Sequence, residues 1–264
     1  MQHRIKPRKR LGQHFLKDLF FARKIVESME IQKDDHILEI GPGQGELTER
    51  LLQSPAECIV AVEIDPECVQ VLRNRFGEDN RLLLIQSDIL KVNLDQWIQG
   101  KNKIRIVGNL PYNITSPILF RLLGLRSSIQ DMTIMVQKEV GERLTSPPGT
   151  KSYGIPSVLF QVYSRIKTLF FVPRTAFYPV PKVDSLVLTF RFFDPIPFDI
   201  KNAVLFERVV KTAFGQRRKM LKNTLKQIVP DENRLNEVSM NLTMRPESLS
   251  VDQFVQLTNE LHKS

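Results

Sequence analysis

A short apolar segment followed by a glycine-rich turn constrains the fold of this chain more than any other feature. Residues 36–40 read His-Ile-Leu-Glu-Ile, and residues 41–48 read Gly-Pro-Gly-Gln-Gly-Glu-Leu-Thr. The pattern predicts a buried strand, a tight turn and the start of a helix. In an open α/β sheet, such a turn lets a ligand approach the backbone at the carboxyl end of a parallel strand. The segment therefore predicts an α/β fold with a nucleotide-type cofactor site at Gly41 and Gly43.

The residue after this turn indicates which kind of cofactor to expect. A dinucleotide-binding turn would carry glycine at position 46, where this chain has Glu46. A carboxylate at a helix N-terminus, close to Pro42, which has no N–H, is a poor cradle for a pyrophosphate. We therefore expect a cofactor without phosphates. S-adenosylmethionine fits, because it is an adenosine that carries a cationic sulfonium and tolerates nearby acids.

Acidic residues follow two further apolar runs. The run 59–62 leads into Glu63, about twenty residues after the first glycine, where a carboxylate can accept hydrogen bonds from ribose hydroxyls. The run 82–85 is followed by Asp88, which could accept the amino group of the cofactor's adenine. A single acid after a strand is usually a solvated loop residue, but acids after successive strands favour a site. We include the next residues, Ile64 and Ile89, among the cofactor-binding candidates.

The tetrapeptide Asn109-Leu110-Pro111-Tyr112 follows another apolar run at 104–107. Its groups suit the alkylation of an exocyclic amine. The Asn109 amide oxygen and the carbonyl of Leu110 or Pro111 could accept the two N–H groups of the amine. Tyr112 could stack on the base, and Pro111 would keep the turn rigid. Alone, the tetrapeptide also fits an ordinary turn after a strand. Beside the cofactor motifs it favours a catalytic site, and Asn109 is also a cofactor-binding candidate.

Together these motifs resemble the ribosomal RNA adenine N6-dimethyltransferase family, and most closely its bacterial small-subunit branch. The resemblance runs nearly end to end. It rests on residues 10–16 (Arg-Leu-Gly-Gln-His-Phe-Leu), the glycine turn, Glu63, Asp88, the Asn-Leu-Pro-Tyr tetrapeptide, residues 177–185 and the basic stretch 214–219.

This resemblance implies a fold and further site residues. The fold would be a Rossmann-like S-adenosylmethionine-dependent methyltransferase domain, a mainly parallel sheet with an antiparallel closing hairpin, plus a small C-terminal helical domain. The segment from His14 to Leu16 would close over the methionine end of the cofactor, and His14 stands where many relatives carry Asn. Phe177 would stack on the target adenine opposite Tyr112.

The resemblance also implies an activity. The enzyme would transfer methyl groups from S-adenosylmethionine to N6 of two adjacent adenines in a hairpin loop near the 3′ end of small-subunit (16S) rRNA. Its partner would be an immature 30S-type particle during ribosome biogenesis. One alternative is a large-subunit (23S) rRNA methyltransferase of the antibiotic-resistance type, which the basic stretch 215–219 disfavours. A second is a ribosome assembly factor in which binding matters more than methylation.

Charge supports a nucleic-acid partner. The chain has 264 residues and a formal net charge of +9, and no acid occurs between Glu207 and Asp231. We expect a helix over 217–229 in which Arg218, Lys222 and Lys226 form one basic stripe. The full set of RNA-binding candidates is Arg8, Lys9, Arg10, Arg217, Arg218, Lys219, Lys222 and Lys226.

Alternation of apolar runs with helical segments predicts the organisation. We expect strands near 36–40, 59–64, 82–86, 104–108 and 132–137, a hairpin of 167–172 with 186–193, and helices at 18–29, 204–214, 217–229 and after Ser250. Asp18 should cap the first helix, Gly215 should end the second, and Ser250 with Gln253 should form a capping box.

We expect a methyltransferase domain over residues 1–195, with a basic N-terminal arm, and a helical RNA-binding domain over 196–264, joined by the proline-rich stretch 194–197. Cys58 and Cys68 lack metal-like spacing, and no long apolar run could span or anchor in a membrane. A reduced, cytoplasmic, monomeric protein without metal is the resulting expectation.

Overall fold

The computed structural model describes residues 5–94, 103–229 and 235–263. The chain divides into two compact units, residues 1–141 with 167–192 and residues 142–166 with 193–264. Residues 142–166 fall in the second unit, which the sequence did not indicate. The predicted domain boundary at residue 195 stays a prediction. Within the part of the chain described, no helix is long and apolar enough to cross a membrane.

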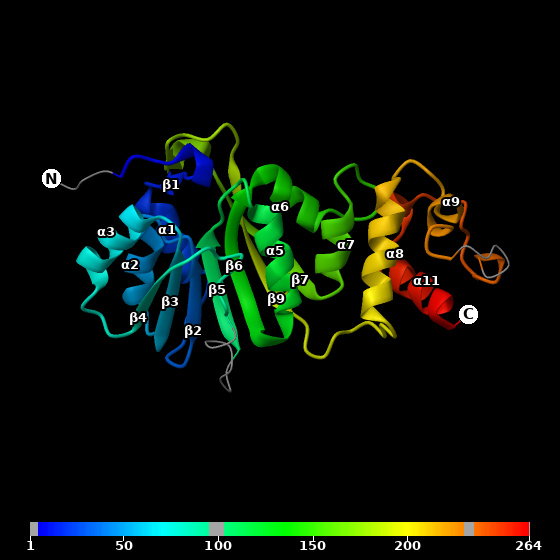
Figure 1. Cartoon of the computed structure of the whole chain (residues 1–264), viewed down its shortest axis with the longest axis horizontal. Coiled ribbons are helices and arrows are strands. Elements are labelled where there is room, and N and C mark those ends of the chain that lie inside the picture. Colours follow the sequence, from blue (N-terminus) through cyan, green and yellow to red (C-terminus); the bar gives the residue numbers. More distant parts are fainter. Residues whose placement is uncertain (1–4, 95–102, 230–234, 264) are drawn as a thin grey trace. The chain divides into compact units, whose positions relative to one another are not determined.

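A seven-stranded sheet forms the centre of the first unit (Figure 1). Its order is β4 (Leu82–Gln86), β3 (Cys58–Glu63), β2 (His36–Ile40), β5 (Ile104–Asn109), β6 (Ile129–Gln137), β9 (Ser185–Phe192) and β7 (Ser164–Val172). The first five run parallel to their neighbours, and β9 runs antiparallel to β6. The predicted fold class is confirmed, and the predicted hairpin strands are the neighbours β7 and β9.

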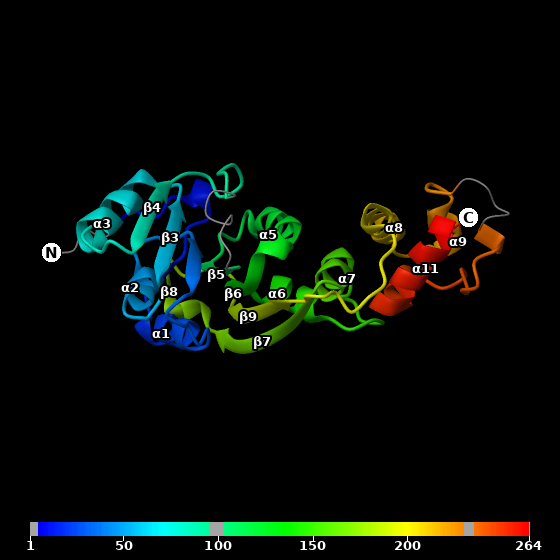
Figure 2. The ribbon, with the colours of Figure 1, turned by 90° about the horizontal axis from the view of Figure 1, so that it is seen from below.

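Helices cover both faces of this sheet, which explains why its central strands are mostly apolar. Figure 2 shows α1 (Leu19–Glu27) and α5 (Thr115–Gly124) on opposite sides of the strands. The core under α1 and α2 (Glu46–Leu52) contains Ile37, Ile59 and Val107 from three adjacent strands. The other helices of the described residues are α3 (Pro66–Phe76), α6 (Lys138–Thr145), α7 (Ile155–Gln161), α8 (Ala203–Gly215), α9 (Leu221–Leu225), α11 (Val251–Lys263), and short 3-10 helices at Lys9–Leu11, Arg126–Ser128, Arg174–Ala176 and Pro246–Ser248.

Two predicted caps are confirmed. The Asp18 carboxylate accepts the N–H of Phe20 at 3.0 Å, and α1 ends at Glu27, two residues before the predicted end. At α11, the Ser250 N–H donates to Gln253 Oε1 at 2.9 Å, and the Gln253 N–H donates to Ser250 Oγ at 3.2 Å. Such reciprocal bonds satisfy donors that a helix N-terminus leaves unpaired, so local sequence is enough to predict them.

The predicted helix over 217–229 is wrong. Only α9 (Leu221–Leu225) is helical there, because the N–H groups of Leu221 and Lys222 donate to the carbonyls of Met244 and Leu242 at 2.9 Å. Arg218 lies in a turn before α9 and Lys226 lies just after it, so these residues do not share one helical stripe with Lys222. Gly215 is the last residue of α8 and not its cap, which is Gln216.

Candidate active site

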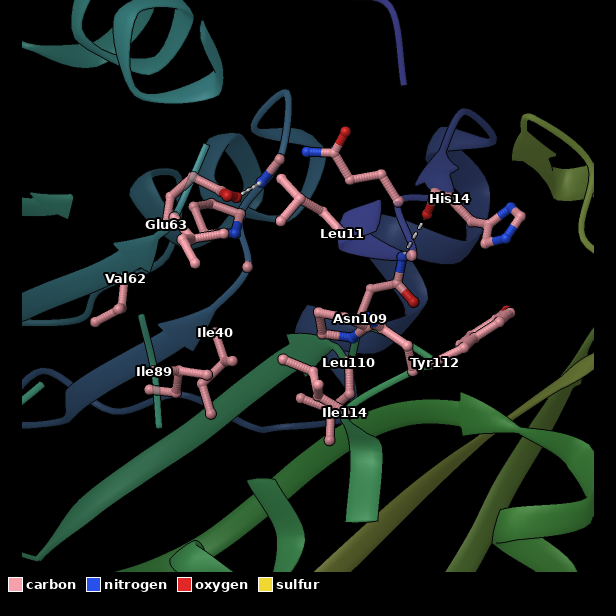
Figure 3. Close-up of a pocket in the computed structure, with 18 of the residues that line it drawn as sticks. Leu11, His14, Ile40, Val62, Glu63, Ile89, Asn109, Leu110, Tyr112 and Ile114 are labelled. Carbon is pink, nitrogen blue, oxygen red and sulfur yellow. Dashed lines mark hydrogen bonds between the residues drawn. The ribbon is translucent and has the colours of Figure 1, made fainter. Parts of the chain in front are cut away.

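A cavity of about 260 Å³ lies at the carboxyl ends of the parallel strands (Figure 3). These strand ends converge on one edge of the sheet, so residues far apart in sequence meet there. Every predicted cofactor-binding residue and the whole Asn-Leu-Pro-Tyr tetrapeptide line this cavity: His14, Leu16, Gly41, Gly43, Glu63, Ile64, Asp88, Ile89, Asn109, Leu110, Pro111 and Tyr112.

The glycine turn brings bare backbone to the cavity wall. Gly41, Gly43 and Gly45 have φ angles of 66°, 60° and 95°, which L side chains rarely adopt. A Cβ at Gly43 would lie 3.0 Å from the Phe15 ring, and one at Gly45 would lie 2.6 Å from the Phe76 ring. The turn therefore needs glycine for both conformation and space, and it leaves room for a cofactor against the backbone.

Glu63, at the end of β3, is held against this turn. Its side chain is 5% exposed, Oε2 accepts the Gly43 N–H at 3.0 Å, and Oε1 accepts the Asp65 N–H at 2.8 Å. Burial raises the pKa of Glu63, and these N–H groups oppose the rise. Each carboxylate oxygen keeps a second lone pair, so the carboxylate can still accept from a diol such as ribose.

Asp88 follows β4 and shares the wall with apolar side chains. Its Oδ1 accepts the Leu90 N–H at 2.9 Å, which orients the carboxylate. Ile40, Val62 and Ile89 lie near one another below Glu63 in Figure 3 and offer an apolar surface. An apolar surface with a few placed polar groups is typical of a nucleoside pocket.

The segment around His14 closes the cavity from the N-terminal side. The His14 carbonyl accepts the Asn109 amide N–H at 2.8 Å. Its ring nitrogen Nδ1 lies 2.7 Å from the Pro179 carbonyl, which can only accept, so Nδ1 carries a proton. The His14 ring stacks on Tyr112, with ring centroids 5.2 Å apart and an interplanar angle of 26°.

Asn109 presents an acceptor that lacks a partner. Because Nδ2 donates to His14, the amide orientation is determined. Oδ1 is buried and has no hydrogen-bond partner within the described part of the chain. The Pro111 carbonyl already accepts the Ile114 N–H at 3.1 Å and the Thr115 hydroxyl at 2.9 Å. Of the two carbonyls that the sequence left open, the structure therefore favours Leu110.

Tyr112 is held in place by its hydroxyl, which lies 2.7 Å from Ser185 Oγ. Burial raises the pKa of Tyr112, so the hydroxyl stays protonated at neutral pH. The ring is thus an uncharged platform beside the Asn109 amide (Figure 3).

Phe177 does not take the predicted position. Its side chain is fully buried, packs in the core under α1, and is not part of the cavity wall. Phe177 pairs with Leu16 in a small antiparallel sheet of β1 (Phe15–Leu16) and β8 (Phe177–Tyr178). A ring with no exposed face cannot stack on a base in this arrangement, so the predicted sandwich opposite Tyr112 is not formed here.

Arg8 and Arg217, which were predicted to bind RNA, form ion pairs with acidic residues of the protein. Arg8 lies 2.6 Å from Glu67 and 3.4 Å from Asp65. Arg217 lies 2.6 Å from Glu247 and also donates to the carbonyls of Thr150 and Lys151. Both therefore have structural roles within their own units. Most of the other RNA-binding candidates are exposed: Lys9, Arg10, Arg218, Lys219 and Lys226. Lys222 is half-buried, and Arg10 also lines the cavity.

Gln13 and Glu46 line the cavity but were not among the predicted site residues. Gln13 Nε2 donates to Asp65 Oδ2 at 2.8 Å, while Gln13 Oε1 accepts the Arg8 N–H at 2.8 Å, so Gln13 links the N-terminal segment to the end of β3. Glu46 lies on the wall at the start of α2. From the sequence, Glu46 was taken only as evidence against a phosphate-binding turn. Its position directly after the glycine turn could also have identified it as a residue of the cavity wall.

Comparisons with known proteins identify the family of this chain. Residues 4–263 match the family described as "Ribosomal RNA adenine dimethylase". The chain belongs to this family. Members of the family are S-adenosylmethionine-dependent methyltransferases, which agrees with the cofactor predicted from the glycine turn.

Similar proteins of this family cover almost the whole chain. The chain is 42% identical over 260 residues to "Ribosomal RNA small subunit methyltransferase A" of Pseudomonas aeruginosa, covering 98% of this chain and 96% of that protein. It is 43% identical over 272 residues to the protein of the same name from Syntrophus aciditrophicus, covering 99% and 96%.

Solved structures show the same fold. A dimethyladenosine transferase from Plasmodium falciparum has a TM-score of 0.81 at 24% identity, covering 95% of this chain and 98% of that one. The 23S rRNA methyltransferase ErmE has a TM-score of 0.70 at 23% identity, covering 94% and 99%. At these sequence identities, the two structures support the assignment of the fold but not of the substrate.

Proposed function

We propose that this protein methylates N6 of two adjacent adenines in a hairpin loop near the 3′ end of small-subunit rRNA, giving dimethyladenosines during ribosome biogenesis. The observation that carries the proposal is the buried Asn109 Oδ1, an acceptor on the cavity wall without a partner in the described residues. A buried unpaired acceptor costs about 1–3 kcal/mol, so it calls for a donor from a ligand. The amine of adenine is such a donor.

The cavity residues also fit the cofactor. The glycine turn offers bare backbone, Glu63 can accept ribose hydroxyls, and Asp88 can accept the amine of the cofactor's adenine. The carboxylates on the wall suit a cation and not a pyrophosphate. When bound, S-adenosylmethionine would supply an electrophilic methyl group with a neutral thioether as the leaving group.

The protein's part in the reaction is to orient the target amine. Asn109 Oδ1 and the Leu110 carbonyl would accept its two N–H groups, which draws the nitrogen lone pair out of the ring system. That lone pair would attack the methyl group supplied by the cofactor, and the amine would then release a proton to solvent. Tyr112 would hold the base by stacking. No general base is needed, so catalysis rests on proximity, orientation and electrostatic fit.

The small subunit is favoured over the large subunit by sequence similarity. The small-subunit methyltransferases named above are 42% and 43% identical to this chain, whereas ErmE is 23% identical. We further propose that the protein acts as a cytoplasmic monomer on an immature 30S-type particle, with the C-terminal helices as a docking surface for RNA.

Mass spectrometry tests the proposed function. Small-subunit particles that lack the modification and, in parallel, large-subunit particles are incubated with the protein and isotopically labelled S-adenosylmethionine, and the rRNA is then digested and sequenced by mass. We expect two labelled methyl groups on each of two neighbouring adenines near the 3′ end. Labelling confined to 23S rRNA, or no labelling of either RNA, would contradict the proposal.

Reversal of two basic residues tests the docking surface. We expect Arg218→Glu with Lys219→Glu to weaken particle binding and to lower the slope of log affinity against log salt by about 1 per phosphate contact removed. Both residues are exposed, so their loss should leave the fold intact. Particle binding is measured by filter retention at several salt concentrations, and cofactor affinity by calorimetry should not change.

The matched control for this reversal lies on α8. Arg208→Glu with Lys211→Glu changes the net charge by the same amount, and Lys211 already pairs with Glu207 at 2.5 Å. The control should keep most of the salt dependence. Equal losses in both double variants would show that overall charge, and not a site at Arg218 and Lys219, drives docking.

A further inference from the structure

A third carboxylate lies on the cavity wall beside those assigned to ribose and adenine. Glu46 is the first residue of α2 and lines the cavity together with Glu63 and Asp88. The preceding residue, Gly45, has a φ of 95°, and a Cβ built on it would lie 2.6 Å from the Phe76 ring and 2.9 Å from Leu72, so only glycine fits at this point of the turn. The position of Glu46 on the wall is therefore determined by the fold.

The surroundings of Glu46 are poor in water and rich in acids. Burial raises the pKa of Glu46 to about 7, and Arg75 on α3 offsets this only in part. Arg75 is itself bound to Glu49 at 2.8 Å and donates to the Gln44 carbonyl. Among the residues that the structure describes, three other titratable groups interact electrostatically with Glu46. They are Glu49 on α2, Glu39 on β2 and the Cys68 thiol on α3.

We propose that Glu46 makes the cavity discriminate between the charged cofactor and its neutral product. This inference rests on the proposed function. The Glu46 carboxylate stabilises the sulfonium of S-adenosylmethionine and gives no such stabilisation to the thioether of S-adenosylhomocysteine. Spent product is therefore bound less tightly and leaves the site.

The chemistry of the two ligands isolates this effect. Both have the same adenine, ribose and amino-acid groups, and they differ only in one methyl group and the positive charge on sulfur. Contacts through Glu63 or Asp88 therefore serve both ligands alike. A carboxylate in a poorly hydrated cavity interacts much more strongly with a cation than it would in water. Glu46 is the remaining wall carboxylate, with no assigned contact to a group that both ligands carry.

Calorimetry with four proteins tests the inference. The affinities of S-adenosylmethionine and S-adenosylhomocysteine are measured at pH 8 for the wild type, Glu46→Gln, Glu63→Gln and Glu49→Gln. We expect Glu46→Gln to lower the affinity for S-adenosylmethionine on the order of tenfold and to change the affinity for S-adenosylhomocysteine by no more than about twofold. Glu63→Gln should weaken both ligands. Glu49→Gln removes the same charge from the same helix outside the cavity, and should keep the wild-type preference.

Proton release gives a second, independent measurement. A bound cation favours the ionised form of Glu46, so its pKa falls and protons leave the protein when S-adenosylmethionine binds near pH 7. Calorimetry in buffers of different ionisation enthalpy should detect this release in the wild type but not in Glu46→Gln, and not with S-adenosylhomocysteine. Affinity for S-adenosylmethionine should accordingly rise from pH 6 to pH 8 in the wild type.

Three outcomes would overturn the inference. If Glu46→Gln lowers the affinity for both ligands equally, Glu46 contacts a group that the two ligands share. Proton release that persists in Glu46→Gln and disappears in Glu39→Gln would assign the titration to Glu39, whose pKa burial raises to about 8. If the wild type binds neither ligand, the proposed function fails and the inference fails with it, whereas equal weakening leaves the proposed function intact.

Discussion

Replacing Asn109 with alanine is expected to lower the rate of methyl transfer by about 10²–10³-fold, the effect of removing one preorganised group that acts on the reacting atoms. The substitution deletes Oδ1, the buried acceptor proposed to hold the target amine. It also deletes the Nδ2 donor that ties the His14 carbonyl to the strand end. Single-turnover kinetics with labelled S-adenosylmethionine and small-subunit particles would measure the loss.

Binding measurements separate this effect from a loss of structure. Asn109→Ala should still bind small-subunit particles with the wild-type salt dependence, because the phosphate contacts proposed for Arg218 and Lys219 lie in the other unit. Asn74→Ala removes the same amide from the exposed face of α3, where Asn74 accepts from Gln70 at 2.9 Å, and should be fully active. An Asn109→Ala protein that methylates at the wild-type rate would remove Asn109 from the mechanism.

The same variant bears on the assembly-factor alternative. A protein that binds particles but cannot methylate reports whether binding alone supports maturation. If cells that carry Asn109→Ala mature their small subunits normally, binding is the main contribution of this protein. If maturation fails as in a deletion, methylation itself is required.

Replacing Arg105 with methionine is expected to destabilise the first unit by about 3–5 kcal/mol, the cost of removing one partner from a buried ion pair. The Arg105 guanidinium lies 2.7 Å from Asp35 and 2.7 Å from Asp131, and it also donates to the Met29 carbonyl. All three charged side chains are at most 10% exposed. Methionine would leave two buried carboxylates without a cation.

Thermal unfolding measures this effect. A loss of this size in a unit of this length corresponds to a fall in midpoint of roughly 10 °C. Adding Asp35→Asn and Asp131→Asn to the Arg105→Met protein should restore much of the loss, because amides need no countercharge. A midpoint within about 2 °C of the wild type for the single variant would mean that the cluster contributes little.

Much of the fold was predictable because its signals are local or periodic. The segments 36–40 and 82–86 match β2 and β4 residue for residue, because each is a short, mostly apolar run bounded by polar residues or a glycine turn. The Asp18 cap and the Ser250–Gln253 box were predictable because the bonding groups lie within three residues of one another. The cavity lining followed from topology, since the carboxyl ends of parallel strands meet at one edge.

Tertiary contacts decided where one predicted helix begins and ends, and which aromatic and basic side chains are used within the protein itself. The sequence by itself determined the sheet, the glycine turn and the residues at its edge, since these depend on chain neighbours and on the repeat of buried positions. It could not predict that the carbonyls of Leu242 and Met244 accept the N–H groups of Lys222 and Leu221. In a helix over 217–229, these N–H groups would instead have bonded to carbonyls one turn earlier. Nor could the sequence predict that Phe177 is buried under α1, or that Arg8 and Arg217 pair with acids 59 and 30 residues away. An aromatic ring or a basic side chain can serve a ligand or the protein itself, and only the three-dimensional position of its partners decides which.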